Sequence, residues 1–143
     1  MKTTPTDKWF SKCVRERAEW TCEKCKKVYT EGQITGKAQG LDCSHYFGRG
    51  SGNLMRHYGS NAFAHCRGCH QHLGSNPHEF AVWVKDQLGD VRYDELVRRK
   101  GRTCKRPKVE QDEMRDHFKA QYEYLRRRRD KGETGYIDFV EWD

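Results

Sequence analysis

Two Cys-x-x-Cys pairs constrain the fold of this chain more than any other feature of its sequence. The first pair is Cys22 and Cys25, the second is Cys66 and Cys69, and 40 residues separate them. A turn with this spacing aims both of its sulfur atoms at one point, so two matched pairs predict a tetrahedral cage of four thiolates. Such a cage suits Zn²⁺, which binds sulfur at about 2.3 Å. We therefore expect one structural zinc ion, which closes a long loop and stabilises the fold.

The composition fits a fold that depends on a metal. Of the 143 residues, 34% are apolar and 34% are charged, so we expect one domain with a thin hydrophobic core. The seven cysteines are an odd number, and the sequence carries neither an apolar signal segment nor a stretch of membrane-spanning length. These features favour a reducing, intracellular location without a membrane. Two disulfides would require an oxidising compartment, and a redox function is less favoured because the pairs form a matched set.

The net charge of +7 is concentrated in one segment. Residues 98–131 hold 14 basic and 6 acidic side chains, whereas the last twelve residues hold four acidic side chains and no basic one. A cationic segment raises the local concentration of polyanions, and nucleic acid is the commonest polyanion in cells. The charge therefore favours a DNA partner, with a solvated helix face as the alternative.

Hydrophobic spacing predicts an α+β protein with short strands between helices. Apolar residues at intervals of three and four predict an amphipathic helix over residues 7–19, capped by Thr6. Three glycines mark a turn or hairpin tip over 30–40. Short runs with aromatic and apolar residues predict strands over 41–47 and 54–58, joined by an irregular glycine-rich loop.

Start and stop residues delimit the later helices. Asn76 and Pro77 predict a helix start, and Gly89 predicts its end. A shorter helix is expected over 94–100, and Pro107 opens a last helix that carries a narrow apolar stripe and ends in four arginines. We divide the chain into a zinc-bound domain over residues 1–104, a basic helical arm over 105–131 and an acidic, aromatic tail over 132–143. The tail is expected to lie over the arm, to bind a partner, or to form a plain surface terminus.

Four polar residues are placed around the cysteine pairs in an order that indicates chemistry. Asp42 and His45 lie between the two pairs, Asn61 precedes the second pair, and His70 follows its last cysteine. This order is typical of ββα-metal nucleases, called HNH after their residues, in which a zinc ion holds a helix against a hairpin. The sequence thus predicts a small zinc-stapled ββα-metal core with flanking helices and a basic C-terminal helix.

Each of these four residues suits one part of phosphodiester hydrolysis. An oxygen ligand and an imidazole hold Mg²⁺ or Mn²⁺ and leave positions open for water and a phosphate oxygen, so we assign Asp42 and His70 to a catalytic metal. A neutral imidazole with a pKa near ~6.5 can take a proton from water, so His45 is the expected general base. Asn61 is expected to orient its ring, and the products are expected to end in a 5′ phosphate.

Arginines supply the expected contacts to DNA. Phosphate recognition favours guanidinium groups, which donate paired hydrogen bonds to phosphate oxygens. The candidates are Arg49, Arg56 and Arg67 around the predicted site, and Arg126, Arg127, Arg128 and Arg129 at the end of the last helix.

The spacing of Asp42 and His45 poses a geometric problem. The two residues are three apart, so on a regular strand their side chains point to opposite faces. We therefore expect a bulge or turn at Cys43–Ser44.

With these residues, the chain resembles the phage lambda NinG proteins, also called Rap, which are recombination nucleases. The match runs through most of the chain and includes Trp9–Arg17, Cys22, Cys25, Asp42–Arg49, Arg56, Asn61, Cys66–Asn76, Phe80 and the helix end at Leu88–Gly89. The resemblance implies branched DNA as substrate, such as Holliday junctions and D-loops, and a homodimer that makes two symmetric cuts. It also implies recombination proteins as partners and a phage-encoded protein in the host cytoplasm.

The Asp-x-x-His spacing is also similar to that of the phage endonuclease VII group of junction resolvases. This likeness implies the same roles for Asp42 and His45. His70 departs from both groups, which usually place asparagine after the last zinc cysteine, whereas histidine is the usual HNH residue there. An imidazole at this position keeps a metal ligand and shifts the expected preference toward Mn²⁺.

Three functions are compatible with these observations. The first is a structure-selective endonuclease that cleaves branched DNA faster than linear duplex. The second is a generic HNH nicking or restriction-like endonuclease that cuts both equally. The third is a zinc-containing module that binds nucleic acid without catalysis, and the set of Asp42, His45, Asn61 and His70 counts against it.

Overall fold

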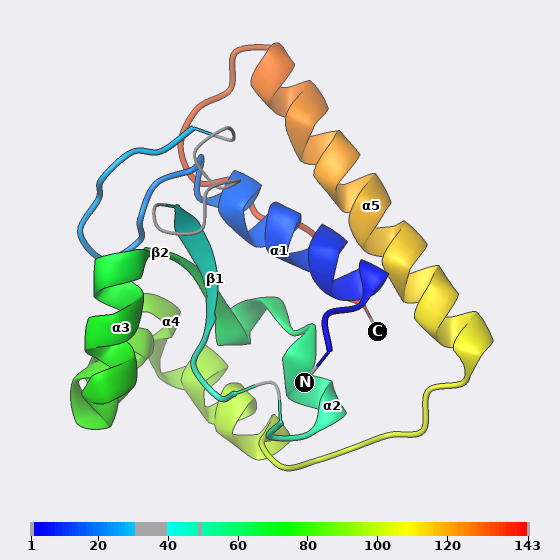
Figure 1. The fold of residues 1–143 in the computed structure, drawn as a ribbon, viewed down its shortest axis with the longest axis horizontal. Helices are drawn as coiled ribbons and strands as arrows, with labels where there is room; N and C mark the ends of the chain where they lie inside the picture. Colours follow the sequence, from blue (N-terminus) through cyan, green and yellow to red (C-terminus); the bar gives the residue numbers. More distant parts are fainter. Residues whose placement is uncertain (1, 31–39, 49, 143) are drawn as a thin grey trace.

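A small sheet and six named helical segments make up the computed structural model, which describes residues 2–30, 40–48 and 50–142. In chain order the elements are α1 (Pro5–Arg17), β1 (Leu41–His45), α2 (Asn53–Arg56), the 3₁₀ turn η2 (Gly59–Asn61), β2 (Ala62–Cys66), α3 (Arg67–Ser75), α4 (Pro77–Arg99) and α5 (Lys108–Asp130). Figure 1 shows α1 between the sheet and α5, with α3 and α4 on the other side of the sheet. The chain is thus an α+β protein, as the sequence predicts. The turn expected over 30–40 lies, apart from its two end residues, outside the described residues.

The sheet consists of two antiparallel strands in an unbroken register. The pairs run from Leu41 opposite Cys66 to His45 opposite Ala62, one residue against one. The prediction of a bulge or turn at Cys43–Ser44 is therefore wrong. Successive side chains of β1 alternate between the two faces of the sheet without interruption.

The second strand begins later in the chain than the sequence predicts. Residues 54–58, predicted as a strand, instead form part of the short helix α2 and the turn that follows it. Met55 of α2 is fully buried. A short apolar run does not distinguish a strand from a buried helical turn, because both bury their large side chains. The strand that does pair with β1 is β2, which leads directly into α3.

The two faces of the sheet contribute to two separate hydrophobic clusters. Leu41, Ala62 and Ala64 pack on the side of α1, in a cluster that includes Phe10. Phe63 points to the opposite side, where it packs with Met55, Leu73, Phe80, Val84 and Leu96 from α2, α3 and α4. The small sheet therefore lies between two layers of helices.

Local sequence signals set the ends of the helices. Thr4 caps α1, since its hydroxyl accepts the Asp7 N–H at 3.2 Å and the Asp7 carboxylate accepts the Thr4 N–H at 2.8 Å. The predicted cap, Thr6, lies two residues further on. At Gly89 the backbone has φ of +78°, which separates α4 into two parts and confirms the predicted stop.

Helix α5, predicted as a basic arm, packs along α1 in the main core. Its apolar stripe contributes Met114, Phe118 and Leu125, all buried. The two helices run in the same direction, since Thr6 of α1 contacts Gln111 and Cys13 of α1 contacts Phe118. The helix is therefore part of the core that α1 shares with the sheet.

The C-terminal residues return across α1 and complete this core. Ile137 and Phe139 are buried, and the Ile137 N–H donates to the carbonyl of Arg17 at 3.0 Å. The Glu141 carboxylate accepts the N–H of Gly59 at 2.9 Å. On α5, Oε1 of Gln121 accepts the N–H of Val140 at 2.9 Å. The acidic tail thus lies over the basic arm, which was the first of its three expected alternatives.

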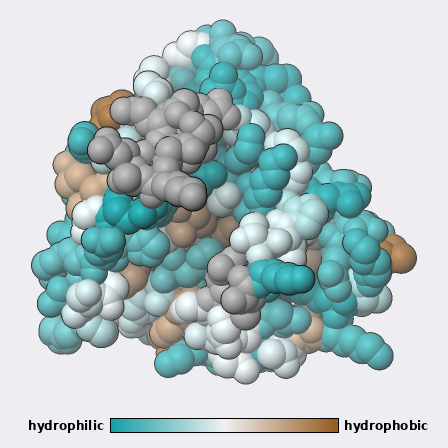
Figure 2. All heavy atoms as spheres, viewed as in Figure 1, coloured by the Kyte–Doolittle hydropathy of each residue, from teal (hydrophilic) through white to brown (hydrophobic). Residues whose placement is uncertain are grey.

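The surface is predominantly hydrophilic on the face drawn in Figure 2, and apolar side chains are scattered over it. Exposed large apolar residues occur on separate elements, for example Val28, Val91 and Val109. Among the described residues, no helix is both long enough and apolar enough to cross a membrane.

A charged cluster ties α1 to α2. The Asp7 carboxylate accepts hydrogen bonds from Nε of Arg56 at 2.9 Å and from Nε2 of His57 at 2.7 Å. Although burial opposes the charged form, the hydrogen bonds from His57 and Arg56 hold the pKa of Asp7 well below its usual range. Since the folded pKa lies below the unfolded value of about 3.9, the cluster stabilises the fold above that pH. This stabilisation is lost as the pH falls through the folded pKa.

Asp7→Asn is expected to lower the free energy of unfolding by about 2 kcal/mol at pH 7, because it leaves Arg56 and His57 without their carboxylate. The difference from wild type should shrink as the pH falls below ~4, because Asp7 then binds a proton in the unfolded wild-type chain, whereas its lowered pKa keeps it ionised in the folded protein. Urea unfolding at a series of pH values measures both effects. Asp86→Asn, at an exposed position of α4, is the matched control and should change stability by less than ~0.5 kcal/mol. A difference that stayed constant from pH 7 to pH 2 would contradict the role of Asp7.

Candidate functional site

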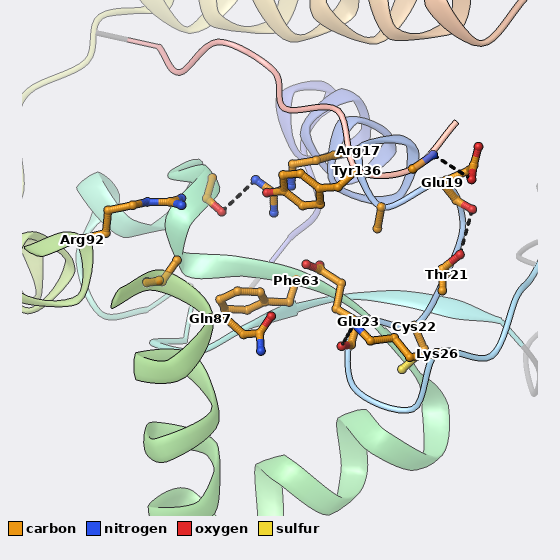
Figure 3. A pocket seen from close by; sticks show the side chains of 14 residues that line it. Arg17, Glu19, Thr21, Cys22, Glu23, Lys26, Phe63, Gln87, Arg92 and Tyr136 are labelled. Atoms are coloured by element: carbon orange, nitrogen blue, oxygen red, sulfur yellow. Dashed lines mark hydrogen bonds between the residues drawn. The ribbon is translucent and has the colours of Figure 1, made fainter. Parts of the chain in front are cut away.

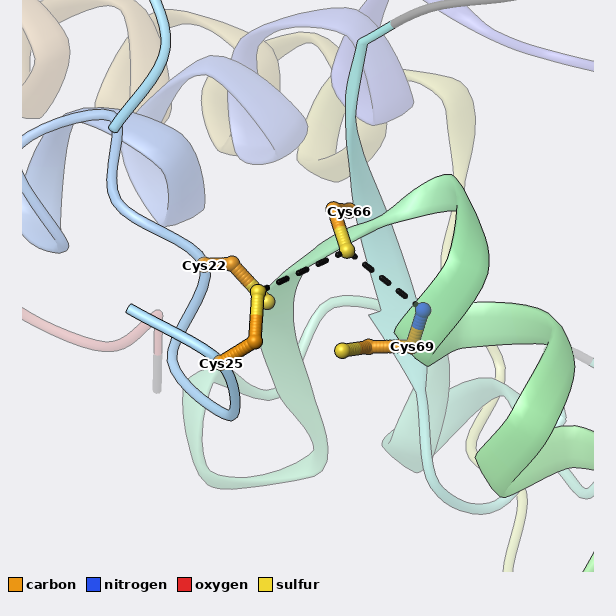
Figure 4. Close-up of side chains that lie close together, drawn as sticks. All are labelled: Cys22, Cys25, Cys66 and Cys69. Atoms are coloured by element: carbon orange, nitrogen blue, oxygen red, sulfur yellow. Dashed lines mark hydrogen bonds between the residues drawn. The ribbon is translucent and has the colours of Figure 1, made fainter. Parts of the chain in front are cut away.

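Four cysteine sulfurs form one cluster, as the paired motifs predict (Figure 4). The Sγ atoms of Cys22, Cys25, Cys66 and Cys69 all lie within 4.8 Å of one another, and those of Cys25 and Cys66 are 3.8 Å apart. Four sulfurs bound at about 2.3 Å to one tetrahedral ion are about 3.8 Å from each other. All of the cysteines are free rather than disulfide-bonded. The cluster could therefore hold a zinc ion, and both its donor set and its dimensions fit that metal.

The first cysteine pair is docked on β2 through the residues around it. The Lys26 N–H donates to the carbonyl of Cys22 at 2.9 Å, and Lys26 has φ of +68°, which closes the turn tightly. Glu23 binds Ala64 of β2 twice, since its N–H donates to the Ala64 carbonyl at 2.8 Å and its carboxylate accepts the Ala64 N–H at 2.7 Å. These two hydrogen bonds fasten the turn that carries Cys22 to β2.

The second cysteine pair lies where β2 becomes α3. Cys66 is the N-cap of α3, and its sulfur accepts the N–H of Cys69 at 3.4 Å. Although burial raises the pKa of Cys66, hydrogen bonds from the Cys69 N–H and from neighbouring thiols lower it to about 7. A thiolate, which is the form that binds metals, is therefore accessible here near neutral pH.

Asp42 and His70, the predicted ligands of a catalytic metal, are adjacent in the structure. Oδ2 of Asp42 lies 3.0 Å from Nδ1 of His70, because α3 follows β2 directly and its first turn lies beside β1. Arg67 binds the same carboxylate, with Nε 2.9 Å from Oδ2. Burial opposes the charged form, but the hydrogen bonds from Arg67 and His70 lower the pKa of Asp42. The carboxylate is therefore ionised at neutral pH.

His45 points to the other face of the sheet, toward α1. Its ring stacks on Phe10 with centroids 6.1 Å apart, and its Nε2 lies 3.0 Å from the carbonyl oxygen of Arg56. A carbonyl only accepts hydrogen bonds, so Nε2 carries a proton and the lone pair of the neutral ring is on Nδ1. The regular strand thus places Asp42 and His45 on opposite faces.

Asn61 is buried and holds the segment after β1 rather than the His45 ring. Its Oδ1 accepts the N–H of Phe47 at 2.8 Å, and its Nδ2 donates to the carbonyls of Phe47 and Met55 at 2.8 and 3.2 Å. These bonds fix the ends of the segment that leads to α2, and so the position of the Arg56 carbonyl that binds His45. Asn61 therefore fixes the backbone at both ends of this segment, next to the Arg56 carbonyl that binds His45.

Two cavities that share Cys43 and His70 in their linings lie beside β1. A cavity of about 630 Å³ is lined by Asp42 and His70, and another of about 450 Å³ is lined by His45 and His70. Cys43 lines both. Burial raises the pKa of the Cys43 thiol to about 12, so it is not a thiolate at neutral pH. The candidate site therefore wraps around β1, with His70 reaching both sides.

Helix α1 contributes polar residues that the sequence did not predict as part of a site. Lys8 and Ser11 line the cavity that contains His45, and Arg15 lines the cavity that contains Asp42. The three residues follow one another at intervals of three and four, so they share one face of α1. This polar spacing was visible in the predicted helix over 7–19, but nothing in the sequence showed that the face meets β1.

Two of the three arginines predicted to contact DNA near the site have partners within the chain. Arg56 binds the Asp7 carboxylate, with Nε 2.9 Å from Oδ1. Arg67 binds Asp42 and is about half exposed. Arg49 lies outside the described residues. Arg56 therefore has a structural role between α1 and α2, whereas Arg67 belongs to the candidate site.

Three of the four arginines at the end of α5 pair with carboxylates, and Arg127 is the exposed fourth. Arg126 and Arg129 reach Glu16 of α1, with N–O distances of 3.5 and 3.3 Å. Arg128 pairs with the carboxylate that follows the helix, at 2.5 Å. Much of the charge of this run therefore holds α5 and the C-terminal segment against α1.

A third cavity, of about 450 Å³, lies between the first cysteine turn, α4 and the C-terminal segment (Figure 3). Its lining includes Arg17, Arg92 and Tyr136 as well as Glu19 and Glu23. Arg17 is buried and donates to two backbone carbonyls, at 3.2 and 2.6 Å. The lining holds three cations, including Lys26, and two carboxylates, and Arg17 is already bound to backbone carbonyls, so we assign this cavity to the packing of these elements.

No protein-family model, no curated protein and no solved structure matches this chain. Its function is therefore inferred from the residues and the geometry of the site.

Cys66→Ser is expected to lose bound zinc and to unfold, because it removes one ligand from the cluster that joins the first turn to β2 and α3. Metal analysis of the purified protein and its thermal unfolding measure the two effects. Cys104 is exposed and lies outside the cluster, so Cys104→Ser is the matched control and should keep zinc and melting temperature. A Cys66→Ser protein that melted like wild type would exclude a structural role for the cluster.

Proposed function

We propose that this chain is a metal-dependent DNA endonuclease of the ββα-metal (HNH) class, with His45 as its general base. The observation that carries the proposal is the arrangement of Asp42, His45 and His70 around one edge strand, next to the four-cysteine cluster. The order of these residues and cysteines along the chain, which is typical of that class, supports the same conclusion. The net charge of +7 suits a polyanionic substrate.

His45 is suited to take a proton from water. The Arg56 carbonyl holds its Nε2, so the neutral ring accepts the proton on Nδ1. The oxygen of that water attacks the phosphorus, the bond from phosphorus to the 3′ oxygen breaks, and the departing oxygen takes a proton from solvent. The products carry a 5′ phosphate and a 3′ hydroxyl. Lys8 and Arg15, which line the two cavities, are placed to contact phosphate oxygens.

Asp42 and His70 are the proposed ligands of a catalytic Mg²⁺ or Mn²⁺. Their ligand atoms, Oδ2 of Asp42 and Nδ1 of His70, are 3.0 Å apart in a hydrogen bond, so both would be within reach of one cation that displaced the shared proton. When bound, such an ion supplies positive charge that stabilises the phosphate and the leaving oxygen. Arg67 shares the Asp42 carboxylate and would turn toward the phosphate when a cation takes its place. The imidazole ligand favours Mn²⁺ over Mg²⁺.

Branched DNA is the proposed substrate class. The support is the resemblance of the motifs to the NinG proteins and to the endonuclease VII group, which act on branched DNA. A homodimer would place two such sites for symmetric cuts in a four-way junction. On the same resemblance, recombination proteins are the proposed partners and the cytoplasm of a phage host is the proposed location.

His45→Ala is expected to reduce cleavage at least ~100-fold, because it removes the group that accepts the proton from water. The assay follows cleavage of a four-way junction and of a linear duplex of the same sequence, with Mg²⁺ or Mn²⁺. The variant should keep its melting temperature and its affinity for DNA in EDTA. His78→Ala, at an exposed position of α4, is the control and should cleave like wild type.

The outcomes of this assay separate the candidate functions. Cleavage by His45→Ala at the wild-type rate would eliminate the assigned mechanism. Equal rates on junction and linear duplex would replace the branched-DNA proposal with a generic HNH nuclease. Wild-type protein that binds DNA but cleaves neither substrate with either metal would indicate a non-catalytic zinc module.

Asp42→Asn is expected to weaken Mn²⁺ binding at least ~10-fold and to reduce cleavage in parallel, because a neutral amide replaces the anionic ligand. Calorimetric titration of the zinc-loaded protein with Mn²⁺ measures the first effect. The zinc content should not change, since Asp42 lies outside the cysteine cluster. Unaltered Mn²⁺ affinity would show that the catalytic ion binds elsewhere.

A further inference from the structure

A cationic and aromatic patch lies where α1 and α5 meet. The ammonium groups of Lys8, Lys12 and Lys119 lie 5.0, 5.3 and 5.7 Å from the centre of the Trp9 ring. Lys12 also lies 5.2 Å from the centre of the Tyr122 ring, and the two aromatic rings are 5.8 Å apart. We call these five residues the Trp9 patch.

The Trp9 patch depends on the parallel packing of α1 and α5. Lys8, Trp9 and Lys12 occupy neighbouring positions on the surface of α1, and Lys119 and Tyr122 are three residues apart on α5. The contact between Cys13 and the Phe118 carbonyl sets the two helices in this register. Residues more than a hundred positions apart in the sequence therefore form one surface.

The charges of the patch suit a polyanion. Three cations around one ring repel one another over distances comparable to the Debye length of about 10 Å, and the aromatic faces offset only part of this repulsion. In the segments of the chain that the structure describes, neither Lys8 nor Lys119 forms an ion pair, and both are exposed. The α5 arginines differ, because three of them pair with carboxylates. A DNA backbone on the patch would relieve the repulsion and release counterions.

The patch is continuous with the candidate site. Lys8 belongs to both, since it lines the cavity that contains His45. Ser11 lines the same cavity, and Arg15 on the same face of α1 lines the cavity that contains Asp42. One face of α1 therefore runs from the Trp9 patch to the two cavities.

We propose that the Trp9 patch binds the sugar-phosphate backbone of a DNA arm that extends from the cleavage site. The location of that cleavage site rests on the proposed function, whereas binding at the patch does not require catalysis. Lysines provide mobile point charges for phosphates without reading sequence. The aromatic rings of Trp9 and Tyr122 provide flat surfaces for sugars or for an unpaired base near a branch point.

The test compares two variants with the same loss of charge. Lys8→Gln/Lys12→Gln/Lys119→Gln removes the cations of the patch, and Lys85→Gln/Lys105→Gln/Lys131→Gln removes three exposed lysines from α4, the following loop and the residue after α5. Fluorescence anisotropy in EDTA measures the affinity of the zinc-loaded proteins for a labelled four-way junction and a linear duplex over a range of salt concentrations. The patch variant should bind at least ~10-fold more weakly at ~100 mM salt, and its log–log salt slope should fall by about 2 to 3. The control variant should lower the slope by less than ~1.

Equal losses in the two variants would overturn the proposal, because they would show an effect of net charge alone. Loss of binding to anionic phosphatidylserine vesicles by the patch variant, with DNA affinity intact, would also overturn it in favour of a lipid surface. If the triple variant melts at a lower temperature than wild type, Lys8→Gln and Lys119→Gln are measured singly. Each should lower the salt slope by about 1, and an unchanged slope in both would exclude the patch as a phosphate contact.

Failure of this proposal is distinguishable from failure of the proposed function. If His45→Ala cleaves normally while the patch variant loses DNA binding, the mechanism fails and the patch stands. If His45→Ala is inactive while the patch variant binds DNA like its control, the nuclease assignment stands and the patch fails.

Discussion

The four-cysteine cluster is the constraint on which the rest of the structure depends. It joins the turn after α1 to the point where β2 becomes α3, two segments that are 40 residues apart. Glu23, inside the first pair, adds two hydrogen bonds to β2. The sheet has few large apolar side chains to bury. A metal bound by the four thiols would stabilise this junction without a large hydrophobic core, because it would join segments that are far apart in the sequence.

The position of α3 follows from that junction and creates the candidate site. Since Cys66 is both the last residue of β2 and the N-cap of α3, the first turn of α3 lies beside β1. There His70 meets Asp42, while the uninterrupted alternation of β1 turns His45 to the opposite face. The site is therefore arranged around the edge of a strand, and no backbone distortion is needed to bring its residues together.

The arginines and lysines around this site differ in whether their charges are paired within the fold. Arg56 is used to anchor α1 to α2 through Asp7, and Arg126 and Arg129 are used to bind Glu16. Guanidinium groups suit such roles because they donate several hydrogen bonds in a fixed geometry. Lys8 and Lys119 of the Trp9 patch are exposed, and mobile charges of this kind suit contacts to a phosphate backbone. The number of basic residues in a sequence segment therefore does not show how many of their charges are already paired within the fold.

The sequence by itself determined the features that depend on short-range spacing. The cysteine pairs predicted the cluster, the apolar periodicity predicted α1 and α5, and Gly89 predicted the break in α4, because each of these depends on neighbouring residues. Only the tertiary structure decided which segment pairs with β1, which backbone groups Asn61 binds, and that the acidic tail completes the core. The second strand was wrongly predicted at 54–58, because a short apolar run fits either a strand or a buried helical turn. The bulge was wrongly predicted in β1, because the sequence does not show that residues on the two faces of an edge strand can line neighbouring cavities. Arg56, Glu16 and Trp9 contact residues that are far away in the sequence. Such contacts depend on how the helices pack, so the spacing of neighbouring residues does not predict them.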